Sequence, residues 1–98
     1  MKRSTFGQIN RITTAAGKRD EVFQLVLTGS DKMPGCKSYV VGKDAENEDV
    51  IWVSEVWDSP DLQAASLKLP ETGAAVEEAM SMIVTFETVA TTAPTIAV

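Results

Sequence analysis

Histidine is absent from this sequence of 98 residues, and cysteine occurs once. A histidine-based nucleophile triad, a histidine-ligated zinc and a proximal-histidine haem site each need a side chain that the chain does not contain. The one cysteine, Cys36, cannot close an intramolecular disulfide or build a multi-thiolate metal site. We therefore expect no bound metal, and a stability that comes from packing.

Positive charge is also scarce. Nine Lys and Arg residues stand against fourteen Asp and Glu residues, which gives a net charge of −5, and only two Lys-Arg pairs concentrate positive charge. This balance argues against a nucleic-acid partner. No apolar run approaches the roughly 20 residues that span a bilayer, so we expect no membrane association and, by default, a cytoplasmic protein.

The length of the chain predicts a single domain over residues 1–98, with a Thr/Ala/Pro-rich tail over 91–98 that is loose or reaches a partner subunit. A domain this small buries only roughly 60 to 65% of the surface that its unfolded chain exposes. Association with a second copy is a natural way to bury more.

The pattern of apolar residues predicts four strands and two helical regions. Strands are indicated by β-branched and aromatic residues that alternate with a period of two, and helices by apolar residues three or four apart. Ser59 and Pro60 are typical of a helix start, and Pro70 breaks or kinks the helix that follows. The predicted strands cover residues 4–12, 38–41, 50–57 and 83–89. The first predicted helical region lies between 17 and 29, and the second consists of two pieces, from 59 to 69 and from about 71 to 80.

The element order β, α, β, β, α, β is that of a ferredoxin-like α+β fold, in which both helices cover one face of an antiparallel sheet. Trp52 and Trp57 are an odd number of residues apart on the third predicted strand, so they point to opposite faces. The face without helices therefore carries apolar side chains that the chain itself leaves uncovered. A two-fold homodimer that stacks sheet on sheet is the simplest arrangement that covers them.

Four short motifs follow one another along the chain: Gly17 to Glu21 at the first helix start, Pro34-Gly35-Cys36, Glu55 to Ser59 at the end of the third strand, and Ala65-Ser66-Leu67. Together they resemble the antibiotic biosynthesis monooxygenase family over about residues 5–90. The resemblance implies a ferredoxin-like fold assembled as a dimeric α/β barrel. It also implies a cofactor-independent monooxygenase that acts on an aromatic small molecule of the phenolic or polycyclic class.

Haem-degrading members of the same family have a signature that this chain matches only in part. Asn10, before Arg and an aliphatic residue, resembles their pocket asparagine, and Trp57 resembles their tryptophan. The place of their proximal histidine falls near Val76, and a histidine found in many other members falls near Gln63. Since neither side chain can replace histidine, haem degradation is disfavoured.

Asn10 and Trp57 are the candidate catalytic residues that the resemblance implies. Asn10 would donate a hydrogen bond to a substrate carbonyl or oxyanion, and Trp57 would stack on a flat substrate or donate its indole N–H. The alternatives are an amide satisfied within the strand and an aromatic side chain that fills the core.

Four further residues are predicted to line the substrate pocket: Tyr39, Gln63, Ser66 and Val76. Ser66 lacks a base to activate it, so helix packing is its favoured role. Glu55 shares the face of Trp57, and if buried it needs a partner such as Arg11, Lys37 or a backbone amide; a structural ion pair is the favoured interpretation. Cys36 is expected to be a buried, inert thiol, and the acidic segment 44–49 a solvated hairpin loop.

Two functional hypotheses follow. In the first, a homodimer oxidises a phenolic, quinol or polycyclic substrate with dioxygen and without a cofactor, because the substrate anion itself reduces dioxygen while the protein orients and desolvates it. In the second, the same pocket binds or senses a small molecule without turnover. Product formation that depends on Asn10 would distinguish them.

Overall fold

The fold comes from a computed structural model that describes residues 6–94. Four strands alternate with three helices and one short 3-10 helix, in the order expected for a ferredoxin-like domain. The strands are β1 (Phe6–Thr14), β2 (Cys36–Lys43), β3 (Val50–Trp57) and β4 (Ile83–Thr92). The helices are α1 (Arg19–Leu27), the 3-10 helix η1 (Ser30–Lys32), α2 (Pro60–Ser66) and α3 (Pro70–Met80).

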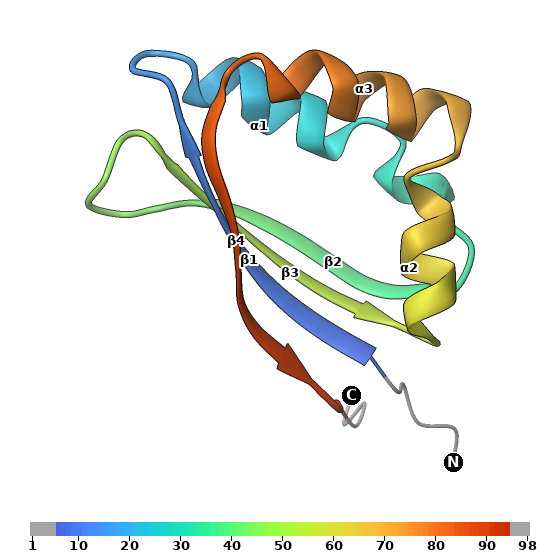
Figure 1. The fold of residues 1–98 in the computed structure, drawn as a ribbon. Helices are drawn as coiled ribbons and strands as arrows, with labels where there is room; N and C mark the ends of the chain where they lie inside the picture. The colour runs from blue at the N-terminus through green and yellow to red at the C-terminus, as the bar shows by residue number, and fades with distance from the viewer. Residues whose placement is uncertain (1–5, 95–98) are drawn as a thin grey trace.

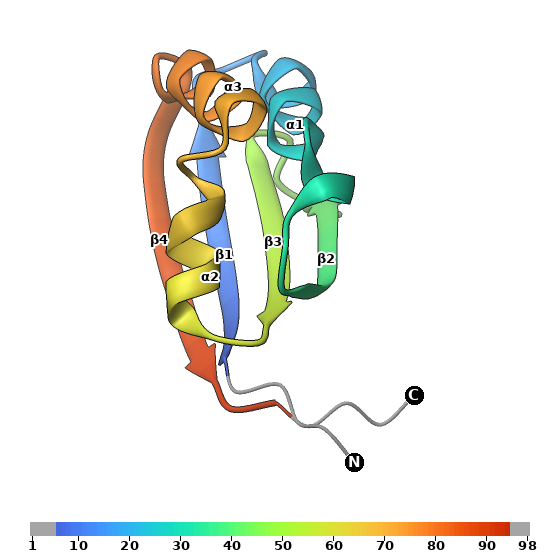
Figure 2. The same cartoon turned by 90° about the vertical axis from the view of Figure 1, so that its right-hand side faces the viewer.

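The four strands form one antiparallel sheet in the order β2-β3-β1-β4, which confirms the predicted ferredoxin-like fold. All helices lie on one face of this sheet (Figure 1). Helices α1 and α3 run side by side over one end of the sheet, and α2 stands over the other end, as Figure 2 shows from the side. The sheet therefore has an inner face toward the helices and an outer face without them.

Local sequence signals explain where the helices on the second half of the chain begin. The Ser59 hydroxyl accepts a hydrogen bond from the Leu62 backbone N–H at 3.2 Å, and Pro60 follows at the first helical position. Pro70 separates two helices because it opens α3, where its missing N–H and fixed φ do no harm. The predicted helix start and the predicted break are both confirmed.

The predicted ends of three strands need correction. Strand β2 extends beyond 38–41 in both directions, β1 runs past residue 12 to Thr14, and β4 continues past residue 89 to Thr92. Pairing explains the last extension, because Gly7 of β1 lies opposite Thr92 and the backbone ladder holds residues without strong strand propensity. Of the residues predicted as strand or tail, 4–5 and 95–98 lie outside the described residues.

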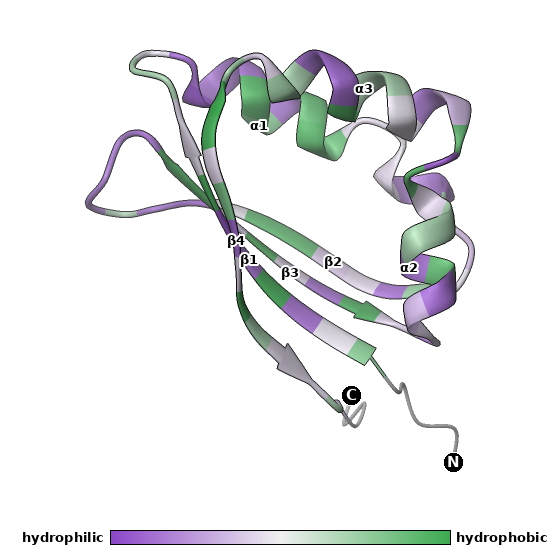
Figure 3. Ribbon diagram, in the orientation of Figure 1, coloured by the Kyte–Doolittle hydropathy of each residue, from purple (hydrophilic) through white to green (hydrophobic). Residues whose placement is uncertain are grey.

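The core lies between the inner face of the sheet and helices α1 and α3. Its buried members come from β1, α1, β3 and α3: Ile12, Val22, Ile51, Val53 and Ala79. Figure 3 shows hydrophobic residues along the inward sides of these helices, whereas the loop that joins β2 to β3 is hydrophilic, as predicted for the acidic segment 44–49.

Helix α3 is only partly buried. Ala75 and Ala79 are buried, but Val76 is 40% and Met80 is 60% exposed. On α2, Ala65 is also exposed, whereas the adjacent Ser66 is buried. The reason is geometric: the two helices cover only part of the sheet, so one flank of each faces an open side (Figure 2).

The outer face of the sheet carries Trp52, and Trp57 is fully buried on the inner face, which confirms their predicted separation. The Trp52 indole N–H donates to the Asp44 carboxylate at 2.7 Å. The Arg11 guanidinium lies 5.6 Å from the Trp52 ring centroid and forms a salt bridge with Glu87 on β4.

Within residues 6–94, no helix combines the length and the apolarity needed to cross a membrane.

Gly35 lies directly before β2 and packs against the Leu62 side chain of α2, so a substitution at this position tests that contact. Its φ is +80°, and an added Cβ would collide with the Leu62 side chain. We expect Gly35→Ala to lower the free energy of unfolding by about 1–2 kcal/mol for the left-handed backbone, plus about 1–3 kcal/mol for the collision. Urea denaturation measures the change.

Gly17→Ala is the matched control, because Gly17 has a φ of +77° but no neighbour within 4 Å of an added Cβ. We expect Gly17→Ala to lower the free energy of unfolding only by the backbone contribution of about 1–2 kcal/mol. Equal losses in the two variants would contradict the close packing of Gly35 against α2.

Candidate functional site

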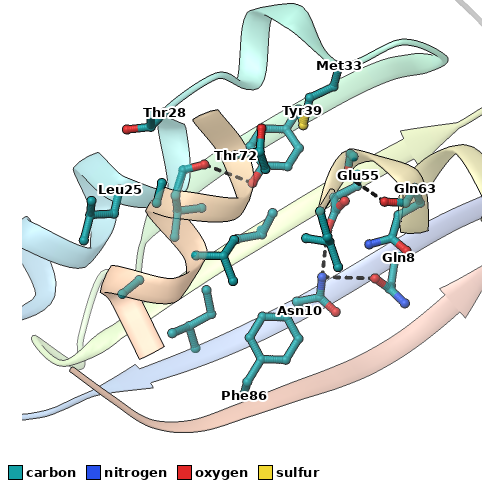
Figure 4. Close-up of a pocket in the computed structure, with 18 of the residues that line it drawn as sticks. Gln8, Asn10, Leu25, Thr28, Met33, Tyr39, Glu55, Gln63, Thr72 and Phe86 are labelled. Carbon is teal, nitrogen blue, oxygen red and sulfur yellow. Dashed lines mark hydrogen bonds between the residues drawn. The ribbon is translucent and has the colours of Figure 1, made fainter. Parts of the chain in front are cut away.

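A cavity of about 480 Å³ lies between the inner face of the sheet and the helices. This volume is within the range of about 300–1,000 Å³ that is usual for small-molecule sites. Most of the lining is apolar, and it includes Leu25 and Phe86, which are labelled in Figure 4. Further apolar members are Val53, Trp57, Ala75 and Ile83. The cavity therefore suits a largely apolar ligand.

The structure brings all the predicted site residues to this one cavity. They come from five different elements and line it together: Asn10, Tyr39, Trp57, Gln63, Ser66 and Val76. Their catalytic or binding roles remain predictions, but their separate positions in the sequence converge on one space.

Glu55 is the centre of the polar end of the cavity. One carboxylate oxygen, Oε1, accepts a hydrogen bond from the Trp57 indole N–H at 2.8 Å, and Oε2 accepts one from the Asn10 side-chain amide at 2.8 Å. The Asn10 carbonyl oxygen in turn accepts from the Thr88 hydroxyl at 2.9 Å. Its amide nitrogen also donates to the Gln8 side chain at 3.3 Å, and Figure 4 shows Gln8 and Asn10 together below Glu55.

The ion pair expected for Glu55 is not formed. Arg11 lies on the outer face and pairs with Glu87 at 2.9 Å, while Lys37 pairs with Asp58 at 3.5 Å. Residues 8, 10 and 12 of β1 face the cavity, so the alternation of the strand turns Arg11 away from it. Neutral donors hold the buried carboxylate instead.

Burial raises the pKa of Glu55, and the hydrogen bonds from Trp57 and Asn10 oppose that rise only in part. Burial also raises the pKa of Tyr39, with a smaller contribution from the negative charge of Glu55. The Tyr39 hydroxyl donates to the Val26 carbonyl oxygen at 3.1 Å. Tyr39 is therefore a neutral phenol anchored to the end of α1.

Ser66 and Cys36 have the inert roles that the sequence favours. The Ser66 hydroxyl is buried and donates to the Gln63 backbone carbonyl at 2.6 Å, within the same helix. Cys36 is only half-buried, its thiol donates to the Ser38 carbonyl oxygen at 3.5 Å, and burial raises its pKa. Neither side chain is poised as a nucleophile.

Val76 lies at an exposed edge of the cavity, and the lining also includes the exposed side chains of Met80 on α3 and Phe86 on β4. Its aliphatic side chain stands where the resemblance places an iron-ligating histidine, so the lining does not fit haem. Among residues 6–94, no three potential metal ligands of the His, Cys, Asp and Glu types gather at one place.

Comparison with known proteins shows the family of the chain. The sequence pattern of antibiotic biosynthesis monooxygenases matches residues 5–78. The chain belongs to this family. A provisionally assigned member from Chloroflexus aurantiacus is 36% identical, with a TM-score of 0.89 and 96% of each chain covered. Family membership supports a monooxygenase-like function in general terms.

More distant solved structures share the fold. A provisionally assigned antibiotic biosynthesis monooxygenase from Deinococcus radiodurans is 16% identical, with a TM-score of 0.75 and 95% of each chain covered. One from Nitrosomonas europaea is 9% identical, with a TM-score of 0.82, and the match covers 96% of this chain and 93% of the other. Among proteins of curated function, none matches this sequence.

Sequence reasoning missed Gln8 and Thr88 as members of the polar network. Gln8 lies two residues before Asn10 on the predicted first strand, so the alternation alone could have found it. Thr88 could not be found in this way. A register shift in β4 pairs Asn10 with Thr88 while Ile9 pairs with Ala90, which leaves Val89 as an extra residue.

The raised pKa of Glu55 predicts a pH dependence of stability. Between the ordinary carboxyl range and the raised pKa, the folded protein binds more protons than the unfolded chain, so its stability falls as the pH rises. Glu55→Gln removes this titration. We expect wild type to lose stability relative to the variant as the pH rises from acid to neutral, measured by urea denaturation at each pH. Parallel pH profiles of the two proteins would contradict the burial of a carboxylate here.

Proposed function

We propose that the protein oxidises a phenolic, quinol or polycyclic small molecule with dioxygen, without a bound cofactor. The observation that carries this proposal is the cavity of about 480 Å³, largely apolar, with one buried hydrogen-bonded network at one end. A flat aromatic ring system fits apolar walls, and its oxygen substituent fits the polar end.

The proposed reaction needs no external reductant. In an anthrone-type substrate, a CH₂ group and O₂ give a C=O group and H₂O, and the four electrons that dioxygen takes up all come from the substrate. One oxygen atom enters the product and the other leaves as water. The protein then has to orient the substrate, exclude water and stabilise the substrate anion.

Asn10 and Trp57 have different proposed parts in this reaction. The Trp57 N–H is already donated to Glu55, so Trp57 contributes the face of its ring as a wall of the cavity. The Asn10 amide makes a long second hydrogen bond of 3.3 Å to half-buried Gln8. A substrate oxygen that replaced Gln8 there would receive this N–H.

The predicted homodimer is part of the same proposal. Val40 on the outer face is 60% exposed, and it neighbours Ser54 and Ile9 in one row across the sheet. Trp52 lies in the next row and is also only half-buried. A second copy stacked on this face would cover these apolar groups.

Val40→Lys tests the dimer, because it places a charge in the proposed interface without touching the cavity. We expect wild type to sediment as a dimer and Val40→Lys to shift toward monomer in analytical ultracentrifugation. Gln24→Lys on the exposed side of α1 adds the same charge and should remain dimeric. A monomeric wild type would contradict the proposed assembly.

Turnover is tested by incubating the protein with anthrone-type and quinol substrates under labelled dioxygen. We expect label in the product above the uncatalysed rate. Asn10→Ala should lower kcat/KM by about 10²-fold, the usual scale for loss of one donor to a developing oxyanion. Gln24→Ala removes an amide outside the cavity and should retain wild-type rates.

The alternative is a binding or sensing protein without turnover. One observation favours it: all side-chain donors of Asn10 and Trp57 already have partners within the protein. In that case the same substrates would raise Tm with no labelled product from wild type.

A further inference from the structure

We propose that the Glu55 carboxylate is the general base of the site and accepts the proton of the substrate hydroxyl group. This inference rests on the proposed function, because it assigns the base of that reaction. It also defines the substrate class more narrowly: the ligand must carry an ionisable O–H, as a phenol, a quinol or the enol form of an anthrone does.

The carboxylate has the free acceptor sites that such a role needs. An ionised carboxylate offers about four lone-pair positions on its two oxygens. Trp57 occupies one position on Oε1 and Asn10 one on Oε2. Each oxygen thus keeps an acceptor position, and the side chain lines the cavity although the residue is only 7% exposed.

No other group that lines the cavity among the described residues can take this role. Tyr39 is the second titratable side chain of the lining, and its hydroxyl proton is donated to Val26. Cys36 on the neighbouring strand lies outside the lining, and burial raises the pKa of both Tyr39 and Cys36, so both stay neutral. The other polar groups around Glu55, from β1, α2 and β4, are the uncharged side chains of Gln8, Asn10, Gln63, Ser66 and Thr88.

Proton transfer to Glu55 moves a negative charge without creating a second one. The O–H bond of the substrate breaks, its proton forms a bond to a Glu55 oxygen, and the electron pair stays on the substrate oxygen. The pair formed by Glu55 and the substrate carries one negative charge before and after this step, so two anions never share the apolar cavity. The resulting phenolate or enolate is the electron-rich species that reduces dioxygen.

The charge environment also suits the transfer. The raised pKa of Glu55 brings the carboxyl closer to the pKa of a phenol than an exposed glutamate would be, which lowers the cost of the transfer. Glu55 takes part in none of the five ion pairs found among residues 6–94, so no cation holds its charge in place.

Glu55→Gln is a suitable test because the network can accommodate the amide. The new side-chain oxygen can accept from Trp57, and its NH₂ can donate to the Asn10 oxygen if the Asn10 amide flips. The flipped Asn10 nitrogen can then donate to Thr88, whose hydroxyl also accepts. Glu77→Gln on the exposed side of α3 is the matched control, with the same chemical change outside the cavity.

The first readout is the pH profile of kcat. Wild type and Glu77→Gln should lose kcat on the acid side as Glu55 becomes protonated. Glu55→Gln should have a kcat about 10²- to 10⁴-fold lower, little change in KM, and no acid limb. A Glu55→Gln variant that keeps both the wild-type kcat and the acid limb would overturn the proposal while leaving the proposed function intact.

The second readout does not depend on turnover. A nitrophenol is added at a pH below its own pKa, and its absorption spectrum reports whether the bound form is phenol or phenolate. We expect phenolate on wild type and Glu77→Gln, and phenol on Glu55→Gln. Phenol on all three proteins, or no binding to wild type, would overturn the proposal. If wild type forms no labelled product, the proposed function fails, and this spectrum still decides the role of Glu55.

Discussion

The site depends on one buried carboxylate that has no cationic partner. Glu55 is held by the indole of Trp57 and the amide of Asn10, at 2.8 Å each. Losing either donor would leave a buried charge poorly solvated, so the three side chains have to be positioned together. Strands β1 and β3 achieve this, because Gln8 and Glu55 are paired across them and Asn10 and Trp57 lie two residues away on the same face.

This constraint links the sheet to the cavity above it. Helices α1 and α3 cover one end of the curved sheet and α2 stands over the other (Figure 1). The cavity lies beneath them, and Glu55 lines it near Gln63 of α2 (Figure 4). Polar donors that usually serve a ligand are here used by the protein's own carboxylate. The Glu55 carboxylate consequently offers acceptor positions at the polar end, which suits a ligand that brings its own hydroxyl proton.

Much of this arrangement could be predicted from the sequence. The bounds of β3, the opposite faces of Trp52 and Trp57, and the start of α2 depend on local alternation and capping, which a sequence displays directly. The hydrogen bonds of Glu55 depend on which strands are neighbours and in which register, and the link from Asn10 to Thr88 depends on a bulge. The exposure of Val76 depends on how far the helices extend over the sheet, and no local pattern records that.

The most direct test of this account is a crystal structure of the protein with a bound hydroxyanthracene or a similar polycyclic phenol. The account predicts that the rings lie in the cavity against Trp57, with the hydroxyl oxygen about 2.5–2.8 Å from a carboxylate oxygen of Glu55. A ligand bound elsewhere, or one whose hydroxyl points to the open edge near Val76, would contradict it.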